Sequence, residues 1–293
     1  MSTTAAQIRE RFAQAGVRGW LHAQPITTAR EVDIDADDAV VMASVYKLAL
    51  LVAFCRTVDA GLDPRQPVVL DPKTRTAGPT GIGALLDPVT LSLRDAAAMM
   101  IAVSDNSAAD ALLDVVGLDQ VNQTLAELDL TRTHILGGTA DVYRTLRRET
   151  HTADDLSALR ALANNDDPPN TSTYDTALSS ATTPRDMTKL LTAIWTDTAA
   201  SPHQCTFARR ALTQQIWPHR LRAGFPYNNV TVAGKTGTLG ALRHEVGVVQ
   251  FHHDPPIAVA VFTHAARADP VLPRADAVIG DTARIAVQAL RRP

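Results

Sequence analysis

The sequence lacks the residue types on which several classes of protein depend. Its 293 residues include only two cysteines, Cys55 and Cys205, and 4% aromatic residues, and its formal net charge is −3. Two cysteines imply no disulfide framework, and no CxxC pair or Cys/His cluster indicates a metal site. With no basic excess to neutralise phosphates and few rings to stack on bases, the chain is not expected to bind nucleic acid.

Long hydrophobic runs are also missing. No apolar stretch approaches the length of a membrane span, and residues 1–12 carry charges where a secretion signal needs an apolar core. We therefore expect a monomeric protein of the cytoplasm that makes no membrane contact, or an exported one only if the start of the chain is misassigned. The 45% hydrophobic and 20% charged residues are typical of a globular protein, and the length suits a single domain over residues 1–293.

The spacing of apolar residues predicts strands near both ends of the chain and helices throughout. We expect helices over residues 3–15, 44–58, 93–103, 107–116, 118–128 and 274–292. We expect strands over residues 19–26, 39–42, 230–238, 245–252 and 257–264. Residues 60–90 are rich in Gly, Pro and Asp, and residues 130–181 are polar and weakly periodic, so both are predicted as loops. The fold class is therefore α+β, with one α/β lobe from residues 1–42 plus 218–293 and an all-helical lobe from residues 43–217.

The first motif that carries chemistry is Ser44-Val45-Tyr46-Lys47, at the start of an apolar helix. Residues three apart lie on the same face of a helix. A serine hydroxyl needs a base within hydrogen-bond reach to become a nucleophile, and a lysine among apolar neighbours loses its proton near neutral pH. The alternative is a serine cap followed by a surface lysine, which the spacing alone favours because it is common.

Two further motifs are weak when taken singly. Ser104-Asp105-Asn106 lies between two predicted helices, where it is either a proton-relaying hydroxyl with a substrate-binding amide or a plain turn. Lys235-Thr236-Gly237-Thr238 lies on a predicted strand, where it either binds a carboxylate or is a strand end with a bulge. All three motifs together, in this order, point to one kind of active site.

The three motifs resemble the S-x-x-K, S-D-N and K-T-G signature of class A β-lactamases and penicillin-binding proteins. Thr182-Thr183-Pro184, with Met187, resembles the helix start of that family, and Arg243 resembles its carboxylate-binding arginine. The resemblance covers most of the chain. It implies a five-stranded antiparallel sheet flanked by helices, with the site between this lobe and an inserted helical lobe. It also implies acyl transfer to a small β-lactam, amide or ester substrate, without a metal or other cofactor.

The resemblance implies a role for each motif residue. Ser44 is the nucleophile, Lys47 the base and Ser104 the group that passes a proton to the leaving nitrogen. The backbone N–H groups of Ser44 and Thr238 form the oxyanion hole. Substrate is bound by Asn106, Lys235, Thr236, Gly237 and Arg243.

The sequence departs from the family where the acyl group is released. The family has R-x-E-x-x-L-N in this region, with a glutamate that activates water, and no such string is present. Glu149, in Arg147-Arg148-Glu149, is the candidate for this role, against the alternative of a solvated surface carboxylate; Asp154 and Asp155 lie nearby in sequence. Three hypotheses follow: a β-lactamase that turns over, an esterase or peptidase with the same chemistry, and a penicillin-binding protein that is acylated without efficient release.

Overall fold

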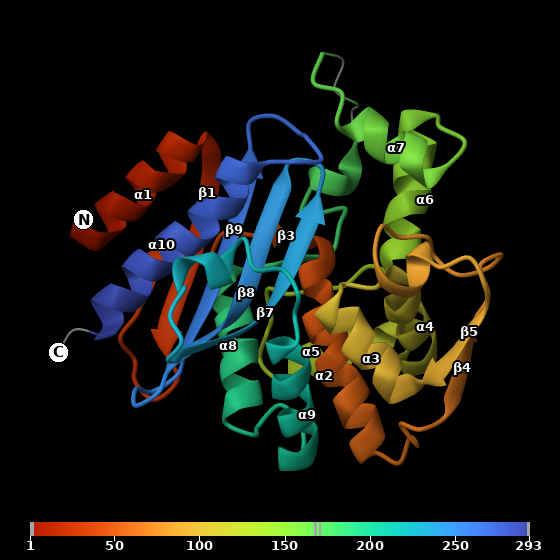
Figure 1. The fold of residues 1–293 in the computed structure, drawn as a ribbon, viewed down its shortest axis with the longest axis horizontal. Helices are drawn as coiled ribbons and strands as arrows, with labels where there is room; N and C mark the ends of the chain where they lie inside the picture. The colour runs from red at the N-terminus through yellow and green to blue at the C-terminus, as the bar shows by residue number, and fades with distance from the viewer. Residues whose placement is uncertain (1–2, 167–168, 170, 292–293) are drawn as a thin grey trace.

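The computed structural model describes residues 3–166, 169 and 171–291, and it is built around a five-stranded antiparallel sheet. The strand order is β2-β1-β9-β8-β7, so the first and last parts of the chain share one sheet (Figure 1). The strands are β1 (Val17–Pro25), β2 (Val32–Ile34), β7 (Val230–Leu239), β8 (Leu242–Phe251) and β9 (Ile257–Ala265). This arrangement confirms the predicted fold class.

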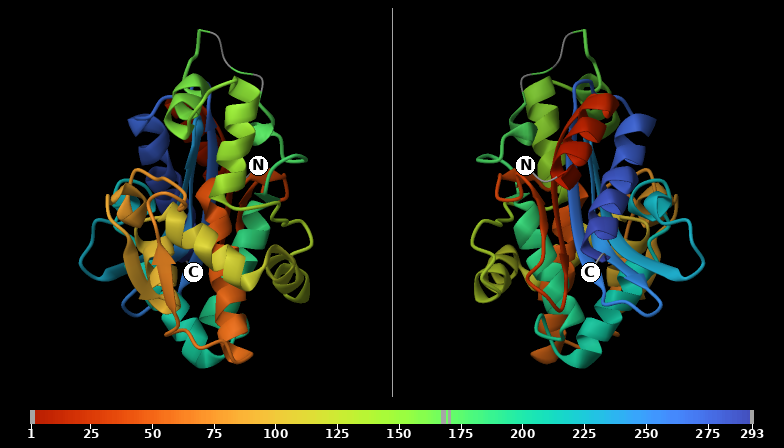
Figure 2. Two further views of the ribbon diagram at one scale, coloured as in Figure 1. Left: turned by 90° about the vertical axis from the view of Figure 1, so that its right-hand side faces the viewer. Right: turned by 90° about the vertical axis from the view of Figure 1, so that its left-hand side faces the viewer.

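Helices cover both faces of the sheet. On one face α1 and α10 lie side by side, and the remaining helices lie beyond the other face (Figures 1 and 2). The helices before residue 130 are α1 (Thr3–Ala15), α2 (Tyr46–Asp59), α3 (Leu93–Ala102), α4 (Asn106–Val116) and α5 (Leu118–Glu127). Those after it are α6 (Thr139–Thr150), α7 (Asp155–Leu162), α8 (Pro184–Trp195), α9 (Pro202–Thr213) and α10 (Pro273–Arg291). The helix predicted to start at Thr183 does so, because the Thr183 side chain accepts the N–H of Asp186 as its N-cap.

Strand β9 contributes to two hydrophobic cores. Its residues Ile257, Val259 and Val261 belong to the core under α1 and α10. The alternate residues Ala258 and Ala260 face the core built around α2, because successive side chains of a strand point to opposite faces. Helix α2 lies so deep that every residue from Tyr46 to Cys55 is buried, as expected of a helix that is apolar all round.

The structure corrects two predictions of loops. Residues 130–181 contain α6 and α7, which pack against each other at the upper right of Figure 1. Residues 60–90 contain β4 (Pro67–Leu70), which pairs with β5 (Val89–Ser92). Both pieces bury few side chains: on α6 only Thr139, Tyr143 and Leu146 are buried. These positions have helical spacing, but they lie among many charged residues, so the sequence favours a polar loop.

The structure also bears on the two cysteines and on membrane-spanning helices. Both cysteines are free and buried, so neither belongs to a disulfide framework. Within the described ranges, no helix combines the length and apolar character that crossing a bilayer requires.

Candidate active site

The three motifs meet at one cleft of about 540 Å³. Ser44 lines it from the start of α2, Ser104 and Asn106 line it from the start of α4, and Thr236 and Thr238 line it from β7. Lys47 and Lys235 have no exposed surface, so they lie behind this lining. The structure therefore brings together segments that are up to about two hundred residues apart in sequence.

A tight turn presents Ser44 at the cleft wall. The short strand β3 (Val40–Val41) leads into a 3₁₀ turn, η1 (Ala43–Val45), which continues as α2. Ala43 adopts a left-handed φ of 43°, a conformation that a residue with a Cβ adopts at a cost of about 1 kcal/mol. This turn leaves Ser44 half-buried while the next side chains enter the core. Ser44, the predicted nucleophile, is thereby held by a buried helix on one side and a strand on the other.

Lys47 is positioned to act as a base. Its Nζ donates to the Ser104 carbonyl oxygen at 2.7 Å, to Asn106 Oδ1 at 2.7 Å and more weakly to Ser104 Oγ at 3.4 Å. Burial lowers the pKa of Lys47 to about 7, against the opposing negative charges of Asp110 and Asp105. A substantial fraction of Lys47 is therefore neutral at physiological pH, and only the neutral amine accepts a proton.

The Ser104 hydroxyl lies between two lysines. Lys235 Nζ donates to Ser104 Oγ at 2.9 Å and to the Thr236 carbonyl oxygen at 2.8 Å. Burial lowers the pKa of Lys235 well below its ordinary value, and the like charges of Lys47 and Arg220 act in the same direction. Since Ser104 Oγ is in reach of both amines, it can give up its own proton and take another. This geometry fits the relay predicted for Ser104.

Asp105, the middle residue of its motif, has a structural role. Its Oδ1 caps α4 by accepting the N–H of Ala108 at 2.8 Å, and its Oδ2 accepts the N–H of Ile82. The carboxylate thereby ties the loop that carries Pro79 and Thr80, both of which line the cleft, to the start of α4. Asp105 thus shapes the rim of the site.

The β7 strand passes close to the turn that carries Ser44. The Thr236 N–H donates to Gln215 Oε1 at 2.7 Å, so it points away from β8. Because backbone groups alternate along a strand, the Thr238 N–H points the same way, as an oxyanion donor must. A Cβ added to Gly237 would lie 3.0 Å from the Met42 carbonyl oxygen. Only glycine lets the strand approach the serine turn this closely.

A cationic group that sequence analysis missed lies beside this edge. Arg220 Nη2 donates to Thr238 Oγ1 at 2.8 Å, and its Nη1 donates to the carbonyl oxygens of Gly237 and His244, both at 2.9 Å. Its Nε pairs with Asp276 at 2.7 Å. Arg220 lines the cleft but lies in a loop outside any motif, so no sequence signal marked it.

Arg243 also lines the cleft, as predicted, but its donors are largely engaged. Nη1 donates to the carbonyl oxygens of Gly240 and Leu242 at 2.7 and 2.8 Å, and Nη2 donates to that of Asp269 at 2.6 Å. The predicted contact of Arg243 with a substrate carboxylate therefore relies on its charge more than on free N–H groups. Arg220 and Arg243 bring two guanidinium groups to this end of the cleft, and Asp276 lies 2.7 Å from the first and 3.7 Å from the second.

The opposite wall of the cleft is apolar. It is formed largely by α6, α7 and the end of β7, through Val142, Tyr143, Leu159, Ala163 and Leu239. The Tyr143 hydroxyl accepts a hydrogen bond from Asn106 Nδ2 at 3.2 Å. Sequence analysis missed this wall because it lies in the stretch predicted as a loop.

Glu149 does not belong to the described lining of the cleft. Its carboxylate accepts the Ser172 N–H at 2.9 Å, the Ser172 hydroxyl at 2.7 Å and the Thr171 hydroxyl at 2.9 Å. Burial acts to raise the pKa of Glu149, but these hydrogen bonds outweigh it and hold the pKa below its usual value. The geometry thus gives Glu149 a structural role, holding the turn η3 (Ser172–Tyr174), and does not support the predicted role in water activation.

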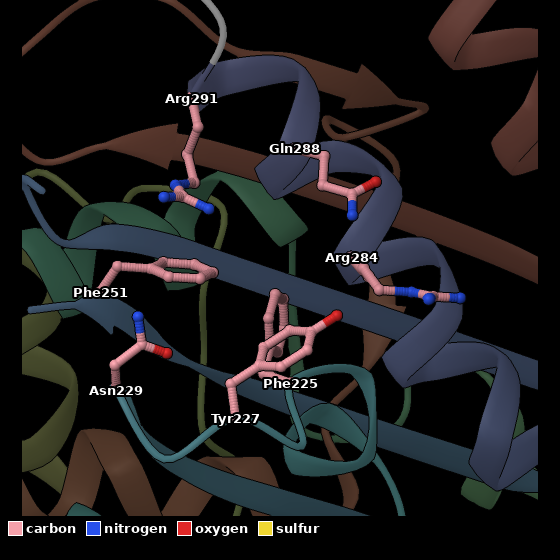
Figure 3. Close-up of a pocket in the computed structure, with 7 residues that line it drawn as sticks. All are labelled: Phe225, Tyr227, Asn229, Phe251, Arg284, Gln288 and Arg291. Atoms are coloured by element: carbon pink, nitrogen blue, oxygen red, sulfur yellow. The ribbon is translucent and has the colours of Figure 1, made fainter.

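A second, smaller cavity of about 270 Å³ lies near the C-terminal end of α10, and none of the motif residues lines it. Figure 3 shows Arg291 over the ring of Phe251, with 3.6 Å between the guanidinium carbon and the ring centroid. Arg291 also pairs with Asp254 at 2.5 Å, so its charge is already neutralised. In the part of the chain that the structure describes, no group of three His, Cys, Asp or Glu side chains is arranged to hold a metal.

This fold and cleft define a serine hydrolase that works through an acyl-enzyme. The model of the β-lactamase enzyme family matches residues 3–290. The chain therefore belongs to that family, and it is a class A β-lactamase-like serine hydrolase.

Individual relatives agree with this assignment. The chain is similar to the β-lactamase regulatory protein BlaB of Streptomyces cacaoi, with 28% identity over 95% of this chain and 94% of the relative. Among solved structures it is similar to a β-lactamase of Sphaerobacter thermophilus, with 26% identity over 98% of this chain and 96% of the other and a TM-score of 0.78. It shares its fold with PBP-A, at 20% identity over 99% and 96% of the two chains and a TM-score of 0.78.

Proposed function

We propose that this protein opens a β-lactam ring by acylating Ser44 and then releases the product by hydrolysis. The observation that carries the proposal is the chain of contacts from Lys47 to Ser104 to Lys235 at the wall of the cleft that Ser44 lines. It supplies a base, a proton relay and a positive charge for one substrate.

Acylation uses these groups in sequence. Ser44 Oγ attacks the lactam carbonyl carbon and its proton passes to neutral Lys47. The oxyanion that forms accepts the N–H groups of Ser44 and Thr238. When the C–N bond breaks, Ser104 gives its hydroxyl proton to the leaving nitrogen and takes one from Lys47. The enzyme is left as an ester on Ser44 with Lys47 neutral again.

Substrate charge is matched by the end of the cleft that holds the two guanidinium groups. Thr236 and Thr238 offer hydroxyl groups there, beside the positive charges of Arg220 and Arg243. β-Lactams carry a carboxylate next to the ring nitrogen, and guanidinium and hydroxyl groups are suited to bind it. The apolar wall formed by α6 and α7 lies against the remainder of the substrate.

Release of the acyl group has less support in the cleft. Among the described residues that line it, Asp269 is the single carboxylate, and its Oδ1 accepts the N–H of Val271 at 2.7 Å. We propose that Lys47, neutral after acylation, activates the attacking water. A base shared between both half-reactions is expected to make release the slower step. A covalent β-lactam binder is therefore the second candidate function, favoured by this shortage of carboxylates.

Intact-protein mass spectrometry distinguishes these functions. The protein is exposed briefly to benzylpenicillin and to a cephalosporin, with the Ser44→Ala variant as control. A mass increase that appears and then decays supports a β-lactamase, and one that persists identifies a covalent binder. If the wild type neither gains mass nor consumes either lactam, the proposal is wrong, and p-nitrophenyl esters become the substrates to test.

A further inference from the structure

A buried carboxylate that the proposed reaction does not use lies directly behind the β7 edge. Glu245, on β8, is paired in register with Thr236 and is 1% exposed. A buried charge persists in a fold only when its oxygens are well satisfied. Its contacts therefore indicate what the carboxylate does.

One oxygen of Glu245 acts through Gln215. Gln215 Nε2 donates to Glu245 Oε1 at 2.7 Å, and Gln215 Oε1 accepts the Thr236 N–H at 2.7 Å. The carboxylate thereby sets which end of the Gln215 amide faces the strand. It fixes the outer edge of β7 within the Lys235-Thr236-Gly237-Thr238 segment.

The other oxygen acts on the segment that carries Arg220. Glu245 Oε2 accepts the N–H of Leu221 at 2.7 Å, at the start of the 3₁₀ turn η4 (Leu221–Gly224). Arg220, the preceding residue, donates to Thr238 Oγ1 and to the carbonyl oxygen of Gly237. A single carboxylate thus holds β7 by two routes, one at Thr236 and one at Gly237 and Thr238.

Space for this carboxylate is provided by a glycine. A Cβ added to Gly234, next to Lys235, would lie 2.8 Å from Glu245 Oε1. The neighbouring strand position on β9 is the uncharged Val261. The charged groups that face Glu245 are Lys235 from β7 and Arg220 from the loop before η4, both of opposite sign.

We propose that Glu245 is a positioning residue for substrate binding: through Gln215 and Leu221 it holds Thr236, Thr238 and Arg220 where they meet an anionic substrate. This inference rests on the proposed function. It assigns the anion-binding geometry of the cleft to a group that touches no substrate.

The role carries a pH signature. Burial raises the pKa of Glu245 to about 7, against the hydrogen bond from Leu221 and the charge of Arg220. The carboxylate is therefore ionised above about pH 7 and protonated below it. Protonation turns one acceptor oxygen into a donor, which weakens one of the two routes. We expect KM for an anionic β-lactam to rise about tenfold between pH 8 and pH 6, the effect of losing one charge-assisted hydrogen bond.

The Glu245→Gln variant tests this role. It keeps the shape of the side chain and removes an acceptor. We expect its KM at pH 8 to be raised about tenfold, with a smaller change in kcat. Its further rise at pH 6 is expected to be smaller than that of the wild type, because only the titration of Lys47 then acts on KM. The matched control, Glu127→Gln, changes an exposed carboxylate on α5 and is expected to behave as wild type. A folded Glu245→Gln protein with the wild-type KM and pH dependence overturns the proposal.

A second variant keeps the test valid if Glu245→Gln does not fold. Gln215→Met cuts the route to Thr236 and leaves the buried charge in place, so we expect a raised KM that still depends on pH. An unchanged KM overturns the proposal.

Hydrogen exchange of the Thr236 amide gives a readout that needs no substrate. We expect its protection to fall in both variants, and full protection in both overturns the proposal. A wild type that no β-lactam acylates rejects the proposed function alone, because the amide measurement still decides the role of Glu245.

Discussion

The two walls of the cleft differ in how their residues are held. On the β7 side, Lys47 and Lys235 both donate to Ser104, and Arg220 donates to Thr238 Oγ1, with distances of 2.7–3.4 Å. On the α6–α7 side, the lining is mostly aliphatic, and Tyr143 makes a single hydrogen bond to Asn106. The first wall has groups suited to the proton transfers and negative charge of acylation, and the second has side chains suited to apolar contact with a substrate. The difference indicates that acylation is the better-supported half of the reaction.

The largest expected effect comes from removing the base of the charged wall. In the Lys47→Met variant we expect the rate of Ser44 acylation to fall about 10³-fold, because Lys47 supplies the amine that bonds both Ser104 and Asn106. The rate is measured by mixing the protein with benzylpenicillin, stopping the reaction at short intervals and following the covalent adduct by mass spectrometry. The Lys47→Arg variant keeps the charge and is expected to be equally slow, since a guanidinium does not accept a proton. Fast acylation in either variant contradicts the assignment of Lys47.

Changing the pH titrates the same wall without mutation. Burial lowers the pKa of Lys47 to about 7, so the amine is neutral above this pH and protonated below it. We expect the acylation rate constant at saturating substrate to fall about tenfold per unit as the pH drops below 7. A rate constant that is flat from pH 8 to pH 5 excludes a base with this pKa.

Placing a carboxylate on the apolar wall sharpens the comparison. Val142 lines the cleft from α6 and is half-buried. In the Val142→Glu variant we expect the covalent adduct to decay about tenfold faster, because a carboxylate there can assist the attacking water. The Val142→Gln variant has the same shape without a base and is expected to leave the adduct lifetime unchanged. Equal lifetimes in both variants indicate that the wall lies too far from the ester.

The smallest effect is expected at Glu149. Replacing it by glutamine removes acceptors for Ser172 and Thr171, so we expect a loss of about 1 kcal/mol in the free energy of unfolding. The adduct lifetime is expected to stay the same, which thermal melting and mass spectrometry check together. A lifetime several-fold longer restores Glu149 as the water-activating residue.

Sequence reasoning reached the charged wall and not the apolar one, for a physical reason. Ser44, Ser104 and Lys235 lie in short motifs whose spacing reflects local backbone geometry, so the motifs can be recognised from the amino-acid sequence alone. Arg220, Gln215 and Glu245 act through contacts between segments, which only the folded chain creates. The buried positions of α6 do recur at helical spacing, but they are few among charged residues, so the stretch reads as polar in the sequence.

The alternation along β9 has a mechanical consequence. Ile257 and Ala258 are neighbours in sequence, yet each is anchored in a different core. If either core unfolds, it disturbs β9, on which the other core also depends. The two cores are therefore expected to unfold together. Heating is therefore expected to melt the sheet and the central helices in a single calorimetric transition. The cleft is therefore expected to keep its shape until the whole fold melts.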